Sequence, residues 1–269
     1  MRNVRNVLIS GCSSYGRGNN YYEDGIKVLL DSVERYAKYV VDEIIIVDFD
    51  LNNSHALDLI LNHSNVKVIG IPSYIKNHFK DLNVGHYMYY CLRHYIMSVI
   101  SQYTTGSNFL WLDAGVCFVG NPREIFDTIE ITGVFTVGHE DQTNRKWTSK
   151  ETVDILKATD VELDSLMLFG GIFGYNKYFV YETAFANLYY LLFKIDLLTQ
   201  SINDKQKLDS SGRIQTIMSI LLERVGVYKH PQQRYAGHLS IEDDQVLFVH
   251  RCNSLNLEML SEYNANFNS

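Results

Sequence analysis

Short apolar runs alternate with amphipathic segments along the first third of the chain. Residues 4–10, 43–49 and 65–71 have the length and the β-branched composition of buried strands. Between the first two runs, apolar side chains recur at helical spacing over 26–40, and Ser54 is placed to cap a second helix before the third run. Strand–helix–strand order of this kind predicts parallel strands joined by right-handed crossovers.

The same alternation continues through the rest of the chain. Apolar residues keep a helical period in three later segments, and Asn121, Pro122 and Glu124 have the residue types of a helix start. Helices are therefore predicted over 86–102, from 121, over 179–198 and over 214–225. The helix over 179–198 is dense enough in apolar residues to belong either in the core or in a homo-oligomer interface.

Four more strands are predicted, over 109–112, 133–138, 166–176 and 246–250. Gly170, Gly171 and Gly174 interrupt the apolar run of one of them, which indicates a bulge or a close ligand approach. Between these elements we expect irregular chain over 73–85, a charged loop over 139–147 and a frayed polar tail over 264–269.

Composition narrows the class of protein. The chain has 269 residues, 46% of them hydrophobic and 20% charged, which suits one large α/β domain or two small ones. No composition shift marks a domain boundary, so a single domain over 1–269 is expected. A net charge of -7 argues against nucleic-acid binding. The chain holds no apolar run of the ~18 residues that a transmembrane helix needs.

The four cysteines are Cys12, Cys91, Cys117 and Cys252. They lie far apart and form no CxxC pair, which argues against a zinc site and for reduced thiols. The N-terminal apolar run is too short for a signal peptide. Together these features predict a cytoplasmic protein.

The first candidate for chemistry is Asp113, which follows the buried run 109–112. A carboxylate at the end of a buried strand is costly to desolvate unless something pairs with it. Ala114 and Gly115 are small enough to let a ligand or another backbone come close. Ligands of open α/β sheets bind at the carboxyl ends of strands, so Asp113 is expected at the working edge. The alternative is an Asp that only caps amides of a turn.

The polar loop after the first strand is the second candidate. Its glycines, Gly11, Gly16 and Gly18, do not have the spacing of a dinucleotide-binding fingerprint, and the P-loop Lys is missing. Asp48, at the end of the second strand, is well placed for a ribose hydroxyl. We therefore expect nucleotide contacts from Gly11, Ser13 and Asp48, with a plain surface loop as the alternative.

Several motifs occur in a fixed order over residues 4–252. They are the acidic strand end at 48–50, the segments 111–126, 169–176 and 214–218, and His250. In order and spacing they resemble the GT-A glycosyltransferases, in particular the family 8-like pattern in which a WLDAD run precedes GDP and LF. The resemblance implies a single GT-A-like domain with a Rossmann-like, mainly parallel central sheet flanked by helices. Its nucleotide-binding half would span about 1–120 and its acceptor half about 121–260.

The resemblance also implies a function, the transfer of a sugar from a nucleoside diphosphate sugar to a glycan or other hydroxyl acceptor. UDP is the expected nucleotide. Asp113 and His250 would hold a divalent cation, Mn or Mg, against the diphosphate. Gly115 and Gly171 would give the donor sugar room, with Gly170 as a further substrate contact, and Gln215 would face the reacting centre if the enzyme retains configuration.

The chain departs from the family pattern at Gly115, which stands where those enzymes carry the second Asp of Asp-x-Asp. Because a hard cation wants several oxygen ligands, Asp113 and His250 are a thin set. Water and the diphosphate could complete the shell, or an acid such as Asp243 or Asp244 could substitute. Alternatively, basic side chains neutralise the phosphates without metal, and the candidates are Arg93, Arg213 and Arg251.

The resemblance also implies that the charged loop over 139–147 lies beside the donor sugar and the acceptor. An inverting transferase needs a carboxylate base for the acceptor hydroxyl, and Glu140 and Asp141 are the candidates. Trp147 is suited to stacking on an acceptor sugar. The alternative is that both carboxylates are solvated loop charges, and His139 is interpreted as a loop residue rather than a catalyst.

Two other functions stay open. One is a GT-A-like protein that binds nucleotide or glycan but has lost transfer with the second Asp. The other is a different Rossmann-like nucleotide-binding enzyme, a dehydrogenase or a methyltransferase, against which the broken glycine spacing speaks.

Overall fold

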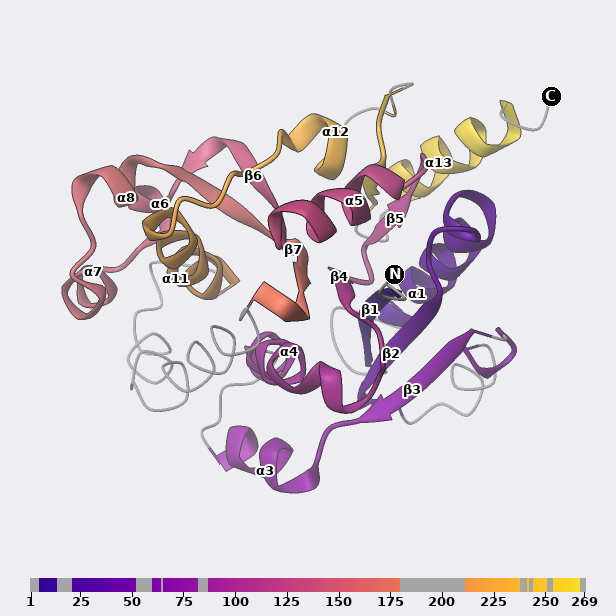
Figure 1. The fold of residues 1–269 in the computed structure, drawn as a ribbon, viewed down its shortest axis with the longest axis horizontal. Coiled ribbons are helices and arrows are strands. Elements are labelled where there is room, and N and C mark those ends of the chain that lie inside the picture. The colour runs from indigo at the N-terminus through magenta and orange to yellow at the C-terminus, as the bar shows by residue number, and fades with distance from the viewer. Residues whose placement is uncertain are drawn as a thin grey trace.

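A six-stranded mixed sheet forms the centre of the molecule (Figure 1). The computed structural model describes residues 5–13, 21–51, 60–63, 65–81, 87–179, 211–237, 241, 244–250 and 254–266. The strands lie in the order β3-β2-β1-β4-β7-β6 across the sheet. They are β1 (Asn6–Ser13), β2 (Glu43–Asp50), β3 (Val66–Gly70), β4 (Asn108–Leu112), β6 (Val134–Thr143) and β7 (Leu166–Asn176).

The neighbouring strands β3, β2, β1 and β4 are parallel, whereas β7 and β6 run antiparallel to their neighbours. A second, two-stranded sheet pairs β5 (Val116–Phe118) with β8 (Leu247–Val249). This arrangement confirms the predicted α/β fold with a mainly parallel sheet. The carboxyl ends of β1, β2 and β4 meet at one edge, where such sheets bind ligands.

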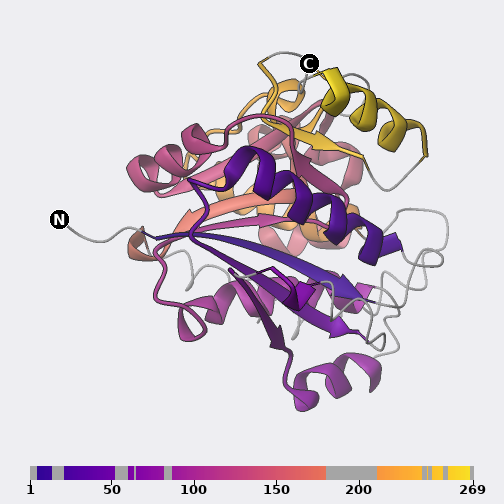
Figure 2. The same cartoon turned by 90° about the vertical axis from the view of Figure 1, so that its right-hand side faces the viewer.

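Helices cover both faces of the sheet (Figure 2). Val7 and Trp111 face one apolar layer and Leu8 and Leu110 face the other, as strand alternation requires. The first layer includes residues of α3 (Ser73–Asp81), α4 (Tyr87–Val99) and α11 (Ser211–Arg224). The second includes residues of α1 (Tyr21–Ser32), the π-helix η1 (Val33–Ala37), α5 (Arg123–Thr132) and α12 (Gln232–Ala236).

Short helices and the C-terminal helix complete the described chain. They are η2 (Ile100–Gln102), α6 (Asn144–Trp147), α7 (Lys150–Leu156), α8 (Asp160–Asp164), η3 (Lys177–Phe179) and α13 (Ser254–Asn266). The expected helix over 179–198 lies outside the described residues except for its first position. The division into two halves near residue 120 stays a prediction.

The first strand is longer than predicted. Gly11, Cys12 and Ser13 belong to β1 and pair with β2, so the polar loop begins after them. A Cβ on Gly11 would lie 2.1 Å from the ring of Phe49, which packs where a side chain would otherwise stand. Glycine is therefore needed at this position for strand packing. The sequence predicted a loop here because polar residues follow Gly11.

Three further segments are more regular than predicted. Residues 73–81 form α3, whose first turn is closed on the carbonyl of Pro72 and whose Ile75 enters the core. The segment expected as a charged loop over 139–147 is the end of β6 followed by α6. The C-terminal segment is helical to Asn266, because Tyr36 donates to Asn264 and Tyr263 donates to the carbonyl of Val119.

A ladder of three asparagines crosses the sheet at the start of β4. Asn108 and Asn176 are buried, and Asn6 is partly buried. Asn6, Asn108 and Asn176 stand opposite one another in register on β1, β4 and β7. Asn108 donates to Asn6 and accepts from Asn176, and Asn6 donates onward to the carbonyl of Val40. Because these amides satisfy one another inside the protein, the ladder fixes the register between the parallel and antiparallel parts of the sheet.

We therefore expect Asn108→Ala to lower the free energy of unfolding by about 2–3 kcal/mol, since it leaves the amides of Asn6 and Asn176 without their shared partner. Urea denaturation monitored by circular dichroism measures the change. Asn77→Ala, at an exposed position of α3, is the matched control and should stay within about 0.5 kcal/mol of the unsubstituted protein. Equal stability of the two variants would contradict this role of the ladder.

An ion pair between a half-exposed arginine and a buried glutamate ties the short helices between β6 and β7 to α11. Arg224 donates to both oxygens of Glu162, at 2.6 and 3.1 Å, and the Glu162 side chain is only 9% exposed. Glu162 also closes a capping box with Thr159 at the start of α8. The guanidinium of Arg224, together with the Thr159 amide, lowers the pKa of Glu162 from 4.5 to about 2 despite the cost of its burial.

Glu162→Gln should therefore lower the free energy of unfolding by about 1–2 kcal/mol at pH 7. The folded carboxyl has the lower pKa, so its contribution is complete above pH 4.5 and is lost as the pH falls toward about 2. Urea denaturation between pH 7 and pH 3 should show the difference narrowing at the acidic end. Glu130→Gln, at an exposed position of α5, is the control. If the loss of stability in Glu162→Gln did not change with pH, the role given to the Glu162 carboxylate would be contradicted.

Candidate functional site

Asp113 occupies the turn between β4 and β5. Its backbone N–H donates to the carbonyl of Gly171 at 2.8 Å, and its carbonyl accepts from Val116 at 2.9 Å. Its side chain is 38% exposed and accepts hydrogen bonds from Trp111 Nε1 at 2.6 Å and from Arg93 at 3.2 Å. Within the described chain these partners are side chains and not turn amides. The backbone of Asp113 therefore forms the turn, and its carboxylate does not cap it.

Arg93 is the buried cation of this site. It comes from α4, its side chain is 7% exposed, and its Nη1 donates both to Asp113 Oδ1 and, at 2.5 Å, to the carbonyl of Gly170. Its guanidinium carbon also lies 5.9 Å from the centre of the Trp111 ring. A buried charge needs such partners. Two donors thus fix Oδ1, while Oδ2 is the oxygen beside Gly171.

Two of the three glycines of β7, Gly170 and Gly171, let other groups come close. A Cβ on Gly170 would lie 2.3 Å from Cγ of Gln215, and a Cβ on Gly171 would lie 3.1 Å from Asp113 Oδ2 and 3.3 Å from the Phe169 ring. Phe173 and Leu168 of β7 are five residues apart in sequence. Their pairing partners on β6, Thr136 and Gly138, are only two residues apart. This irregularity confirms the bulge that the glycines predicted.

Five predicted site residues therefore converge at the carboxyl end of β4. They come from four parts of the chain far apart in sequence, namely α4, the turn after β4, β7 and α11, and they are Arg93, Asp113, Gly170, Gly171 and Gln215. We call these five residues the Asp113 cluster. The contacts among them are the strongest structural support for the predicted site.

His250 reaches the same region through the small sheet. Val116 of β5 stands opposite Val249 of β8, so the residue before Val116 and the residue after Val249, Gly115 and His250, lie at one end of this antiparallel pair. The His250 side chain is fully buried, and burial lowers its pKa from 6.5 to about 4. The imidazole is thus neutral at neutral pH, the form that binds metals. Ala114, which precedes Gly115 in the sequence, is buried as well.

The predicted nucleotide contacts lie at the ends of β1 and β2. Cys12 pairs with Asp48, whose Oδ1 accepts from the amide of Leu51 at 2.7 Å. Burial, with a smaller effect from the carboxylates of Glu23 and Asp48, raises the pKa of the Cys12 thiol to about 12, so the thiol stays protonated. Ser13 is buried at the same strand end. These positions share the sheet edge with Asp113 because β1 adjoins β4.

The predicted acceptor residues have their described contacts with α12 and with the end of β6. The backbone N–H of Glu140 donates to Gln232, and its carboxylate accepts from the amide of Gln233, so it faces α12. Asp141 is exposed on β6, and Trp147 donates to Gln142 from α6. Among the described residues no hydrogen bond or ion pair joins these three side chains to the Asp113 cluster.

Sequence reasoning missed three residues of this region. Trp111 holds Asp113 Oδ1, and its spacing of two residues along a strand, which puts both side chains on one face, was an available signal. Phe169 borders Gly171, and the ring of His139 lies 5.0 Å from the ring of Phe169. No local pattern reveals that contact, because it depends on how β6 and β7 pair.

Of the other proposed ligands, one acid has a described partner and the side chains of three residues are not described. Asp244 lies 3.6 Å from Arg234, a residue of α12, while Asp243, Arg251 and the side chain of Arg213 are outside the described part. Within the described ranges, no group of three or more His, Cys, Asp or Glu residues is arranged to hold a metal ion. The described helices include none that is both long and apolar enough to cross a membrane.

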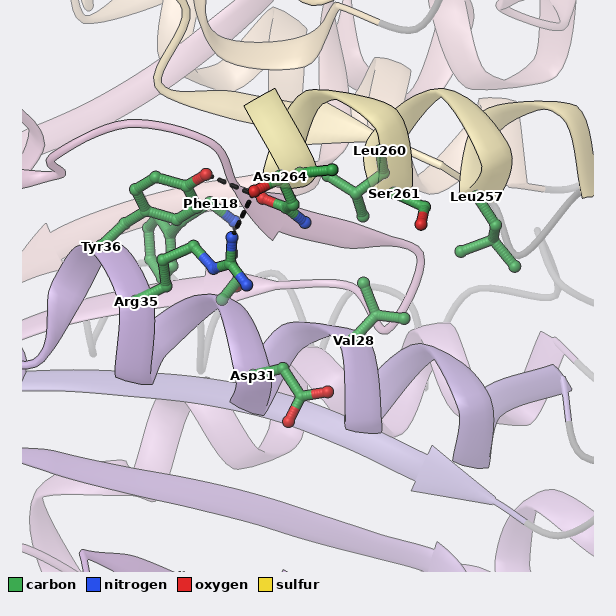
Figure 3. A pocket seen from close by; sticks show the side chains of 11 residues that line it. Val28, Asp31, Arg35, Tyr36, Phe118, Leu257, Leu260, Ser261 and Asn264 are labelled. Atoms are coloured by element: carbon green, nitrogen blue, oxygen red, sulfur yellow. Dashed lines mark hydrogen bonds between the residues drawn. The ribbon is translucent and has the colours of Figure 1, made fainter. Parts of the chain in front are cut away.

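A cavity of about 420 Å³ lies between α1, η1 and α13 (Figure 3). Arg35 and Tyr36 close one end of it through hydrogen bonds to Asn264 at 3.1 and 2.8 Å. None of its lining residues belongs to the Asp113 cluster. The cavity therefore belongs to the packing of the C-terminal helix and not to the strand-end site.

Comparison with known proteins gives a fold and no closer relationship. The sequence matches no protein-family model and no curated protein. The structure is similar to mouse xyloside xylosyltransferase 1 in its apo form, with a TM-score of 0.56 at 12% identity over 93% of this chain and 98% of that one. It is also similar, with a TM-score of 0.56 at 17% identity over 88% of this chain, to 40% of the bifunctional glycosyltransferase WbbM. The chain therefore has a GT-A-like fold.

Proposed function

We propose that this protein transfers a sugar from a nucleoside diphosphate sugar, with UDP as the nucleotide, to a hydroxyl group of a glycan or other acceptor. The observation that carries the proposal is the convergence of Arg93, Asp113, Gly171 and Gln215 at the carboxyl edge of a GT-A-like sheet. The fold supports it, because both solved structures named above are glycosyltransferases.

The donor would lie along the ends of β1, β2 and β4. In this arrangement Ser13 and Asp48 meet the nucleoside at the ends of β1 and β2, and the sugar enters the space over Gly171. Asp113 Oδ2 accepts a hydrogen bond from a donor hydroxyl there, because Oδ1 is already occupied by Trp111 and Arg93. Gln215, packed against Gly170, borders the same space.

The residues present fit a weakly held divalent cation. Asp113 offers one carboxylate oxygen and His250 a neutral imidazole, and a Mg²⁺ or Mn²⁺ ion commonly completes such a set with substrate phosphates and water. When bound, the ion would neutralise the diphosphate leaving group. Arg93 supplies a fixed positive charge to the same region whether or not the ion is bound.

The absence of a second carboxylate at Gly115 favours one other function, a protein that binds nucleotide sugars without transferring them. The two functions share the donor site and differ in turnover.

On the acceptor side, Trp147 and Asp141 are proposed to contact the acceptor, with Glu140 held by α12.

A thermal-shift panel tests donor binding. UDP and UDP-sugars at about 100 times their dissociation constant should add about 2.7 kcal/mol and raise the melting temperature by about 5 °C. The panel includes Mn²⁺, Mg²⁺ and EDTA, with NAD and S-adenosylmethionine as comparison ligands. A shift with the comparison ligands alone would contradict the proposal, and donor binding without UDP release would leave the binding-only function.

Gly171→Ala should weaken UDP-sugar binding by at least about tenfold, equivalent to about 1.4 kcal/mol, because the new methyl group would stand 3.1 Å from Asp113 Oδ2. The Arg93–Asp113 ion pair stays intact in this variant. Gly70→Ala is the matched control, since a Cβ on Gly70 meets no atom within 4 Å. Isothermal titration measures the affinity, and equal binding by both variants would exclude the space over Gly171 as the sugar site.

Asp113→Asn should abolish UDP release while the protein stays folded, because the amide nitrogen cannot accept a hydrogen bond. Asp127→Asn, on the exposed side of α5, is the control for the loss of one carboxylate. Circular dichroism checks the fold, and a UDP-release assay checks turnover. A folded Asp113→Asn variant with normal turnover would overturn the role given to Asp113.

A further inference from the structure

The space over Gly171 is narrow. A Cβ on Gly171 would stand 3.1 Å from Asp113 Oδ2 and 3.3 Å from Cε1 of the Phe169 ring. Because both atoms lie within 3.3 Å of one point, the gap between them cannot exceed twice that distance. A hydroxyl oxygen that donates to Oδ2 at about 2.8 Å and touches a ring carbon at about 3.5 Å fills such a gap. The space between Asp113 and Phe169 therefore holds one layer of ligand atoms.

Packing holds Phe169 in place as one wall of this gap. Its side chain is buried and belongs to the apolar layer that includes Leu112 and Ile172. The ring of His139 also packs on it, with the ring centres 5.0 Å apart and the planes tilted by 47°. A ring packed among such neighbours has few other conformations. The width of the gap is therefore a fixed property of the folded chain.

The two walls of the gap differ in chemistry. Asp113 Oδ2 accepts a hydrogen bond, whereas the Phe169 side chain has no polar atom. A hydroxyl group suits this pair, because it donates to the carboxylate and only the edge of its oxygen meets the ring. A larger polar substituent would need a second layer of atoms and would leave its own polar groups unpaired against the ring. The gap therefore favours a single hydroxyl over any larger group.

The proposed donor geometry indicates which hydroxyl enters the gap. Asp113 is also proposed, with His250, to hold a cation against the diphosphate. The part of the sugar nearest Asp113 is then the part closest to the diphosphate. The diphosphate is bonded to the anomeric carbon, and the adjacent carbon that carries a hydroxyl is carbon 2. The substituent on carbon 2 is therefore expected between Asp113 Oδ2 and Phe169.

We infer that Phe169 is a specificity-determining residue, which admits a UDP-sugar with a free hydroxyl on carbon 2 and excludes one with an acetamido group there. The inference rests on the proposed donor site. Under it, UDP-hexoses and UDP-pentoses are the donor class, and UDP-N-acetylhexosamines are rejected because their acetamido group needs the second layer of atoms. A wall of this kind selects by blocking the wrong substrate.

The affinities of matched donors test this inference. UDP-glucose and UDP-N-acetylglucosamine differ only in the substituent on carbon 2, as do UDP-galactose and UDP-N-acetylgalactosamine. In the pair that binds more tightly, isothermal titration of the unsubstituted protein should show at least about 30-fold weaker binding of the N-acetylated donor. Phe169→Leu shortens the wall and keeps an apolar side chain in the core. It should reduce this difference by at least about fivefold, and Phe169→Ala should reduce it further.

A second ligand and a control variant separate specificity from folding. Affinity for UDP, which carries no sugar, should stay within about threefold in Phe169→Leu. Phe135→Leu is the matched control, since it removes a ring from the same apolar layer whose described ring contacts are with His230 and Tyr235. It should leave the donor preference unchanged.

The possible failures are distinguishable. The inference would be overturned if the unsubstituted protein bound both members of a pair equally, or if Phe169→Leu bound UDP normally and kept the full preference. Either result would leave the proposed sugar transfer standing. An unsubstituted protein that binds none of the four UDP-sugars would overturn both.

Discussion

The buried guanidinium of Arg93 is the constraint around which the site is built. A cation at 7% exposure is tolerable only with partners in fixed positions, and Asp113 Oδ1 and the Gly170 carbonyl provide them. The first partner stands at the end of β4 and the second within β7, so one side chain of α4 ties both strands together. The Asp113 backbone repeats the link through the Gly171 carbonyl. The orientation of Asp113 is therefore set by the fold before any ligand arrives, as preorganised binding requires.

The antiparallel return of β7 explains why glycines stand where they do. A strand that runs beside the parallel half brings its backbone across the carboxyl end of β4, where a ligand would otherwise meet side chains. Gly170 yields its side-chain space to Gln215, and Gly171 leaves the space beside Asp113 Oδ2 open. The asparagine ladder at the other end of the same strands holds the register that makes these two positions coincide. A slip by one residue would turn the glycines to the opposite face.

Local patterns were enough to predict the parallel strands, the helices around them and the position of Asp113 at the end of a strand. Their signals are short-range, since each is an apolar period or a polar residue at a strand end. Gln215 was singled out by the family resemblance instead, and the roles given to Gln215 and Arg93 stay predictions. The predictions failed where long-range pairing decides the outcome. Gly11 looked like part of a loop because only the packing of Phe49 makes it a strand residue. The segment after Gly138 looked like a charged loop because its pairing with β7 resumes only at Thr143.

The proposed donor and acceptor sides of the site are held by different kinds of structure, and under the proposed function this difference bears on specificity. The donor side rests on continuous parallel strands and a buried ion pair, which leave little freedom to reshape it. The acceptor side consists of the bulged part of β6 and the short helices that follow, joined to α11 by the Glu162–Arg224 pair. Segments of this kind change in length and sequence at low cost to the core. Among the described residues, Gly171 and Phe169 are where the two proposed sides come together, so a new acceptor preference could arise on one side without disturbing the proposed donor site on the other.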